Sequence, residues 1–546
     1  MYYANWLEIL VLCIQLLGGY VQCHPSKTNC DRQSVDCLKE YESRMHPMIR
    51  SKRETIDSVS MINEYYDESS SIYWQSRAQH TLKKHLERER NLNRAKNVIF
   101  FLGDGMSIPT ITAARIYVGQ NRGQSGEEAR LSFENFPHVG LSKTYCIDKQ
   151  VPDSACTSTA YLCGVKANFQ TIGVNGRVQR DDCNAAANTE NHVNSLLALA
   201  QQAGKKTGII TTTTVTHASP AGNYAHTPNR MFECDADIIH YQNNDTNLNA
   251  CQDIASQLVY NEPGRKINVI FGGGRTKFLP KSIKDVEDFQ GEREDGMNLI
   301  DKWSREKNNA KVIFNRDELI NLNIKDTEYV LGLFAPDHMD YNLEANEKQP
   351  KLWEMVESAI QILQNDENGF YLFVEGGRID HGHHNAQAIK ALDETVEFSN
   401  AIQRAVELIN QDDTLLIVTS DHGHTLSIAG YPDRGNPIAG INTVVSDIDN
   451  LPTLTLSYAN GPGYDTIRFE NGTRKDLTGL KIDSNFTYPG TYPSQYETHG
   501  GDDVGVFAFG CMSHLFSGVY EQHTIPHLIN YASCMGEGIT ACNQFD

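Results

Sequence analysis

Four short apolar segments along the chain have the composition of buried β-strands. Apolar and β-branched residues run through them almost without interruption, which is typical of parallel strands covered on both faces. Helical stretches separate the segments, which span residues 97–102, 207–210, 370–374 and 414–419. We therefore predict an α/β fold with a large central, mostly parallel sheet and helices on both of its faces.

Residues that can bind metal ions follow each of these predicted strands. In chain order they are Asp104, His217, Ser219, Glu375, Asp421 and His422. In open α/β sheets, ligands bind in the crevice outside the carboxyl ends of the strands. We therefore expect these side chains to converge on one site.

The sequence Asp-His-Gly-His-His at 380–384 is expected to open a helix. Asp380 and His384 are four residues apart, so they would share one face of that helix. Carboxylate and imidazole together suit zinc, whereas an oxygen-only set such as Asp104, Glu375 and a hydroxyl group suits magnesium. The sequence thus predicts both kinds of metal pocket.

A serine in the segment 151–160 is the candidate nucleophile. The segment is typical of a turn followed by a helix start rich in small residues. The oxygen of Ser154 would lie beside unpaired backbone N–H groups at the positive end of the helix. A nearby zinc ion would favour the ionised hydroxyl, so that no histidine base is needed. This chemistry is typical of phosphoryl transfer, in which Arg230 is the candidate to hold two phosphate oxygens.

Seven ordered motifs resemble those of the alkaline phosphatases, most closely the animal members. The resemblance extends from about residue 67 to residue 546. The motifs are FLGDGM at 101–106, VPDSA at 151–155, TAYLCGVKANFQTIG at 159–173, HASPAG at 217–222, EGGRIDHGHH at 375–384, SDHGH at 420–424 and THGGDDV at 498–504.

The resemblance implies broad hydrolysis of phosphate monoesters through a phosphoserine at Ser154, with Arg230 gripping the phosphate. It also implies two zinc ions and one magnesium ion. One zinc would be held by Asp380, His384 and His499, the other by Asp104, Asp421, His422 and the Ser154 oxygen, and magnesium by Asp104, Ser219 and Glu375. His217 and His381 would support the site from outside, and His424 would either support a zinc site or cap its turn.

The segment 431–497 changes to short β-like stretches with proline, glycine, asparagine and aspartate. It resembles the inserted crown domain of animal members, which implies a homodimer. The expected organisation is a signal peptide at 1–23, a flexible extension at 24–66, a catalytic α/β domain at 67–430 that resumes at 498–546, and the crown domain at 431–497.

Net charge and hydropathy indicate which kinds of partner and which cellular compartment to expect. The chain has 48 basic and 69 acidic residues and a net charge of −21, which argues against a nucleic-acid partner. Small phosphate monoesters would instead meet local positive charge from the metal ions and Arg230. We expect a secreted or extracellular protein, because the apolar residues 6–17 are typical of a signal peptide. Membrane attachment stays open, because no apolar tail of the kind that directs lipid anchoring follows residue 542.

Thirteen cysteines fit an oxidising compartment. The resemblance implies bonds from Cys183 to Cys251 and from Cys534 to Cys542. Cys156 either pairs with Cys146 or remains free, because sequence does not decide connectivity. The glycosylation sequons begin at Asn244, Asn471 and Asn485.

One position departs from the animal pattern. Relatives with a calcium site have an acidic residue after the phenylalanine of Leu-Gly-Leu-Phe, but Ala335 follows Phe334 here. We therefore expect no equivalent calcium site.

Two alternatives remain, one from the same superfamily and one from a different functional class. A phosphodiesterase or sulfatase of the same superfamily would keep a related metal framework, and a surface-binding protein would keep only the scaffold. Arg230 favours monoesters, because a diester partly lacks the free oxygens that it would hold. The intact set of ligands argues against a pure binding protein.

Overall fold

The computed structural model describes residues 67–241, 250–536 and 538–539. The chain divides into two units, Met1–Tyr73 and Trp74–Asp546. The predicted signal peptide and N-terminal extension, Asn244 and Cys542 lie outside the described residues.

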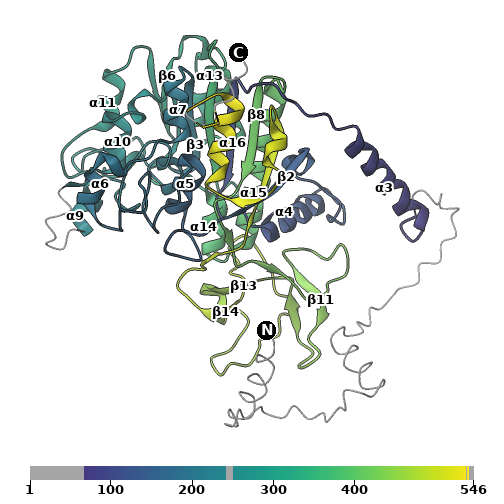
Figure 1. Cartoon of the computed structure of the whole chain (residues 1–546). Helices are drawn as coiled ribbons and strands as arrows, with labels where there is room; N and C mark the ends of the chain where they lie inside the picture. The colour runs from purple at the N-terminus through teal and green to yellow at the C-terminus, as the bar shows by residue number, and fades with distance from the viewer. Residues whose placement is uncertain (1–66, 242–249, 537, 540–546) are drawn as a thin grey trace, which may run out of the picture. The chain divides into compact units, whose positions relative to one another are not determined.

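A ten-stranded sheet runs through the second unit (Figure 1). Its strand order is β17-β2-β16-β8-β1-β7-β3-β4-β6-β5, and only β16 runs antiparallel to its neighbours. The predicted mostly parallel sheet is confirmed. The strands are β1 (Asn97–Gly103), β2 (His138–Lys143), β3 (Lys206–Thr214), β4 (Val269–Gly273), β5 (Ala310–Ile313), β6 (Tyr329–Leu333), β7 (Phe370–Gly376), β8 (Thr414–Thr419), β16 (Val504–Gly510) and β17 (Gly518–Glu521).

Helices connect the strands and vary from one turn to 21 residues in length. They are α3 (Ser71–Leu86), α4 (Ile108–Asn121), α5 (Ser154–Cys163), α6 (Cys183–Ala187), α7 (Leu196–Gln202), α8 (Ala218–Ala221), α9 (Asp235–Tyr241), α10 (Ile254–Tyr260), α11 (Leu299–Arg305), α12 (Arg316–Ile320), α13 (Leu352–Leu363), α14 (Arg378–His384), α15 (Ala388–Leu408) and α16 (Thr524–Ser533).

The four strands predicted from apolar runs are consecutive neighbours in the sheet, in the order β8-β1-β7-β3. Leu102 at the end of β1 is in register with Glu375 on one side and Thr419 on the other. Glu375 is in turn paired with Thr211 of β3. Because these strands are parallel and in register, the residues after them emerge at the same edge of the sheet.

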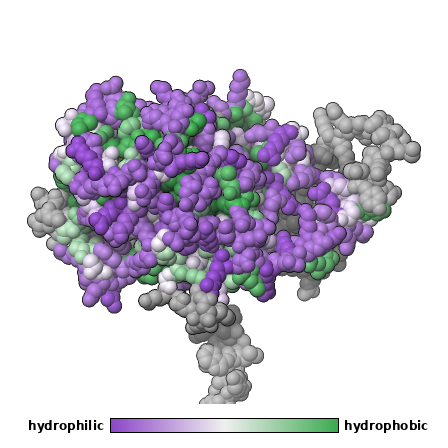
Figure 2. All heavy atoms as spheres, turned by 90° about the horizontal axis from the view of Figure 1, so that it is seen from above, coloured by the Kyte–Doolittle hydropathy of each residue, from purple (hydrophilic) through white to green (hydrophobic). Residues whose placement is uncertain are grey.

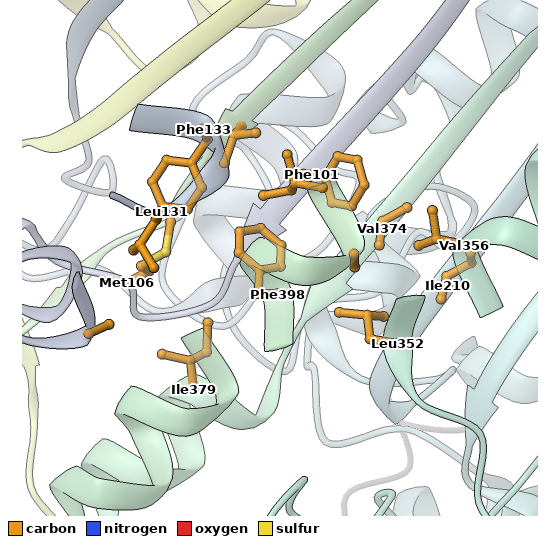
Figure 3. Packing of buried hydrophobic residues seen from close by; sticks show 14 of the residues in the cluster. Phe101, Met106, Leu131, Phe133, Ile210, Leu352, Val356, Val374, Ile379 and Phe398 are labelled. Carbon is orange, nitrogen blue, oxygen red and sulfur yellow. The ribbon is translucent and has the colours of Figure 1, made fainter. Parts of the chain in front are cut away.

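Successive side chains of β1 enter two different hydrophobic cores. Ile99 and Phe101 join the core that includes α4, α13 and α15, whereas Val98 and Phe100 join the core that includes α5, α7, α10 and α16. Burial on both faces explains why the strand is apolar from Val98 to Leu102. In the first core, Phe398 of α15 packs edge-on against Phe101, with ring centroids 5.8 Å apart (Figure 3).

Two small sheets occupy the segment predicted as an insertion. One contains β10 (Ser427–Ile428), β13 (Leu456–Gly461) and β14 (Gly490–Pro493), and the other contains β11 (Ile441–Val445) and β12 (Pro452–Leu454). Tyr458 and Tyr488 are buried in the same core as β1 and α15. The segment therefore packs on the main body through a shared core, near α14 (Figure 1).

The described surface is predominantly hydrophilic on the face seen in Figure 2, with hydrophobic residues in scattered patches. Within residues 67–241, 250–536 and 538–539, none of the helices combines the length and hydropathy needed to cross a bilayer.

Two disulfides join described residues, Cys183–Cys251 and Cys146–Cys156. Cys534 is also disulfide-bonded. The Cys146–Cys156 bond answers the question that the sequence left open for Cys156, which lies on α5 two residues after Ser154.

We expect the double variant Cys146→Ser, Cys156→Ser to lower the free energy of unfolding by about 2–3 kcal/mol, because the bond closes a short loop in the unfolded chain. Denaturant unfolding would measure the change. Cys163→Ser on the same helix is the control, since Cys163 is a free thiol. Equal stability of the double variant and the wild type would contradict this role.

Candidate active site at the carboxyl ends of the sheet

The residues predicted to converge do meet at one edge of the sheet. Asp104 directly follows β1, Glu375 is near the end of β7, and Asp421 and His422 follow β8. All four are fully buried. The loop after β3 leads into α8, which contains Ser219.

Ser154 is the first residue of α5, and Asp153 caps the helix by accepting a hydrogen bond from the backbone N–H of Cys156. The serine hydroxyl is therefore free to face the site. Its Oγ lies 3.2 Å from Nε2 of His422 and 3.5 Å from Oδ1 of Asp104. The residue is only 1% exposed.

Asp104, Asp421 and His422 form one group of potential metal ligands. Nε2 of His422 is 3.1 Å from Oδ2 of Asp421 and 3.6 Å from Oδ1 of Asp104. The backbone N–H of Gly105 donates to Oδ1 of Asp421 at 2.9 Å. Gly105 has a φ of +66°, and a Cβ there would lie 2.5 Å from the ring of His424, so glycine is required for this close approach.

A second group contains Asp380 and His384 of α14 together with His499. Nε2 of His499 lies 3.0 Å from Nε2 of His384 and 3.4 Å from Oδ1 of Asp380. The Nδ1 atoms of the two histidines face backbone carbonyls, which only accept hydrogen bonds. Each Nδ1 is therefore protonated, and in the neutral rings both Nε2 atoms present lone pairs to the same point. A cation at that point would relieve their repulsion.

The two groups are joined by the rings of His422 and His499, which stack with centroids 3.6 Å apart. Residues from the ends of β1 and β8 are thereby brought next to residues from α14 and from the start of β15 (His499–Gly500). The arrangement places two potential cation positions close to Ser154.

A third group of potential ligands contains Asp104, Glu375 and His217, and Ser219 of α8 offers a further oxygen. In this part of the described chain, Oδ2 of Asp104, Oε1 of Glu375 and Oγ of Ser219 are buried without a hydrogen-bond partner. Oε2 of Glu375 accepts a hydrogen bond from Thr213 at 3.2 Å. Three buried oxygens without partners are costly unless a cation binds them, and oxygen ligands suit magnesium.

Arg230 reaches the site from the loop that follows α8. Its Nη1 donates to Oδ2 of Asp153 at 3.1 Å, and its Nη2 donates to Nε2 of His217 at 3.0 Å. Burial and the nearby guanidinium hold the pKa of His217 well below its usual value. The sequence could not place Arg230, and the structure brings its guanidinium into contact with Asp153, the residue before Ser154.

Burial raises the pKa of three carboxyl groups that lie near one another. The pKa of Asp104 is well above its ordinary value because of burial and the charge of Asp421. Burial also raises the pKa of Asp421 and raises that of Glu375 to about 7. Such crowding of buried carboxylates is unfavourable without compensating positive charge, and it is common at functional sites.

The pKa of Asp380 is shifted in the opposite direction, below its ordinary value. Burial alone would raise its pKa, but His384 and His424 outweigh burial and hold it well below its ordinary value. Burial likewise disfavours the charged form of His424, yet Glu497 and Asp380 raise the pKa of that histidine to about 10. The sequence left two roles open for His424, and its contact with Asp380 at 2.6 Å puts it behind the group of ligands.

Glu497 and His338 were not among the predicted residues. Glu497 lies one residue before the motif that begins at Thr498, so the only sequence signal was its position. His338 lies in the loop after β6, with its ring centroid 4.5 Å from that of His381 and 5.5 Å from that of His217. Nothing in the local sequence around His338 indicates this position.

The fold and the site together define a class: an α/β protein in which a buried serine lies among carboxylate and imidazole groups able to hold several metal ions. The family model described as "Alkaline phosphatase" matches residues 95–535. The chain belongs to the alkaline phosphatase family.

Relatives in that family are similar over most of the chain. The chain is 46% identical over 523 residues to the membrane-bound alkaline phosphatase of Bombyx mori, covering 92% of each protein. It is 46% identical to the human tissue-nonspecific isozyme, covering 87% of this chain and 91% of the isozyme.

Solved structures show the same fold at lower identity. The alkaline phosphatase of Thermus thermophilus superposes with a TM-score of 0.58 and 22% identity, covering 84% of this chain and 95% of that one. The enzyme of the Antarctic bacterium TAB5 gives a TM-score of 0.55 and 22% identity, covering 82% of this chain and all of that chain.

Proposed function

We propose that the protein hydrolyses phosphate monoesters to an alcohol and inorganic phosphate, with Ser154 as a nucleophile that is transiently phosphorylated. The observation that carries this proposal is the position of Ser154 Oγ, within 3.5 Å of both Asp104 and His422 at the start of a helix. A helix N-terminus favours the negative charge of a phosphate group.

The donor sets fit two zinc ions and one magnesium ion. Mixed carboxylate and imidazole groups suit zinc, and the unpartnered oxygens suit magnesium. When bound, these ions neutralise the carboxylates, favour the ionised serine hydroxyl and stabilise charge on the phosphate. We assign Asp380, His384 and His499 to the first zinc site, Asp104, Asp421 and His422 with the Ser154 oxygen to the second, and Asp104, Ser219 and Glu375 to magnesium.

In the first step, Ser154 Oγ forms a bond to phosphorus while the bond from phosphorus to the alcohol oxygen breaks. The hydroxyl proton is lost to solvent, and the departing alcohol regains a proton. Burial of Ser154 limits competing attack by bulk water. In the second step, water attacks phosphorus and loses a proton, the bond from phosphorus to Ser154 Oγ breaks, Oγ regains a proton, and inorganic phosphate leaves.

Arg230 would hold two phosphate oxygens, because a planar guanidinium can donate to both at once. Asp153 pairs with Nη1 of Arg230 and also caps α5. It therefore links the phosphate-binding arginine to the helix that carries the nucleophile. Because these contacts recognise the phosphate group and not the alcohol, we expect broad specificity for the alcohol.

The test is hydrolysis of a chromogenic phosphate monoester at alkaline pH by the purified protein, before and after chelation and with zinc and magnesium returned. Chelator-sensitive activity that is restored by the metals supports the proposal. A folded, metal-loaded protein that cleaves only a diester or a sulfate ester would assign it to another reaction, and one that cleaves none of them would favour a binding role.

We expect Arg230→Lys to lower kcat/KM for the monoester by about 10- to 100-fold, because an ammonium group cannot hold two oxygens in the same planar geometry. Arg180→Lys is a matched control, since the Arg180 side chain is about half exposed and pairs with Asp181. Steady-state kinetics would show the difference. Unchanged kinetics in Arg230→Lys would remove Arg230 from phosphate binding.

We further propose a secreted homodimer in which residues 431–497 form the crown domain. Disulfides favour an oxidising compartment. The sequon residues Asn471 and Asn485 are exposed, as glycosylation requires.

A further inference from the structure

Glu497 contacts His384, a ligand of the first proposed zinc site, and also His424, which contacts the ligand Asp380. Glu497 is 1% exposed and belongs to no predicted ligand set. Its Oε1 accepts hydrogen bonds from the backbone N–H of Thr425 at 2.8 Å and from the Thr425 hydroxyl at 2.5 Å. A buried carboxylate held by two donors has a fixed orientation, and its remaining oxygen, Oε2, contacts Nδ1 of His424.

His424 links Glu497 to Asp380. Its Nδ1 faces Glu497, and its Nε2 faces Oδ1 of Asp380 at 2.6 Å. Both ring nitrogens are engaged with carboxylate oxygens, so neither has a lone pair directed at a metal ion in this arrangement. His424 is therefore placed to orient Asp380, although it lies close enough to be grouped with the ligands.

The backbone of Glu497 holds a second ligand. Its carbonyl oxygen accepts a hydrogen bond from Nδ1 of His384 at 2.6 Å, and its N–H donates to the carbonyl of His384 at 2.9 Å. The first bond keeps the proton on Nδ1 and leaves Nε2 for a metal ion, which is the usual way in which an outer group sets the tautomer of a histidine ligand.

His499, the third ligand, follows Glu497 by two residues. There β15 pairs with β9 (Gly423–His424), and His499 is directly opposite His424. The chain returning from the inserted segment thus delivers the ligand His499 and the carboxylate of Glu497 together.

We propose that Glu497 is a positioning residue for the first zinc site, with its carboxylate orienting Asp380 through His424 and its backbone orienting His384. This inference rests on the proposed metal sites. The Glu497 carboxylate would help to retain the zinc ion at the first site and would have no direct effect on the second zinc ion.

Substitution of Glu497 leaves its backbone in place, so it tests the carboxylate path alone. We would load zinc into the wild type, Glu497→Ala, His424→Ala and the double variant, and follow zinc release into a chelator and zinc content by elemental analysis. Glu354→Gln is the matched control, because Glu354 is also buried but pairs with Arg316 on a different part of the chain.

We expect one zinc ion per chain to be released about 10- to 100-fold faster from Glu497→Ala and His424→Ala. The double variant should release it no faster than the single variants, because both act through one path. The second ion and the Glu354→Gln control should behave as in the wild type. Glu497→Gln, which keeps the size of the side chain, should fall between the wild type and Glu497→Ala and provides the test if the alanine variant does not fold.

Release at the wild-type rate in both Glu497 variants would overturn the inference. So would effects of Glu497→Ala and His424→Ala that multiply in the double variant, or equal acceleration for both zinc ions. A wild-type protein that binds no zinc would instead overturn the proposed metal sites, so the two failures are distinguishable.

Discussion

Replacing Ser154 with alanine is expected to lower kcat/KM for a phosphate monoester by about 10⁴-fold or more, while the fold and metal content are retained. This corresponds to about 5.5 kcal/mol of lost transition-state stabilisation. The size follows from the role: without Oγ there is no phosphoserine, and only direct attack by water remains. The fold should persist, because Asp153 and not Ser154 caps α5.

Ser158→Ala provides the control for this experiment. Ser158 lies on the same helix, is also fully buried, and its hydroxyl donates to the carbonyl of Ala155 at 2.8 Å. Its replacement should leave kcat/KM within about twofold of the wild type, since it contacts none of the proposed ligands. Mass spectrometry after acid quenching should find a phosphoryl group on Ser154 in the wild type. Activity of Ser154→Ala near the wild-type level would exclude the phosphoserine route.

Removal of the metal ions is expected to reduce activity to below about 1% and to destabilise the protein. The structure explains the second effect. Asp104, Asp421 and Glu375 are buried together, and their raised pKa values show that their negative charges oppose folding. Bound cations would offset that repulsion. Calorimetry or fluorescence melting with and without chelator would measure the change in Tm.

Glu375 makes one contribution to the pH dependence of the metal-free protein. Burial raises its pKa from 4.5 to about 7. Between these values the folded state keeps a proton that the unfolded state has released, so the contribution of Glu375 to stability falls as pH rises from about 4.5 to about 7. Buried histidines with lowered pKa values, such as His217 and His422, contribute in the opposite direction. The loss from Glu375 is about 3 kcal/mol. It should be absent in the metal-loaded protein, because the ions favour the ionised form.

Glu375→Gln tests this origin of the pH dependence. Glutamine does not ionise, so between pH 5 and pH 7 the stability of the metal-free variant should rise relative to that of the metal-free wild type. If stability changed with pH in the same way in the metal-free variant and the metal-free wild type, the raised pKa of Glu375 would not describe the folded state.

Much of the fold could be predicted from local composition. The four apolar runs correspond to β8, β1, β7 and β3. The segment 380–384 is helical but does not open the helix as expected, because α14 begins two residues earlier, at Arg378, and ends at His384. Strand and helix are decided largely by residue type and period over a few residues. The antiparallel position of β16 could not be predicted in this way, because pairing across the sheet depends on residues far apart in the chain.

For the candidate site too, some features could be predicted from local sequence and others depended on tertiary contacts. Ligand chemistry is a property of single residues, so the sequence alone indicated carboxylates and imidazoles at the ends of strands, a serine at a helix start, and the family motifs. Only the tertiary structure showed that Asp153 caps α5, that Cys156 pairs with Cys146, and that His424 joins Asp380 to Glu497.

The physical reason is the distance along the chain over which these contacts act. His424 and Glu497 are 73 residues apart, and His499 bonds to Pro152 across 347 residues. No local pattern encodes such partners, because each is set by how the sheet and the returning segment pack. By itself the sequence determined the strands, the types of ligand and the family; the tertiary structure decided which groups hold those ligands in place.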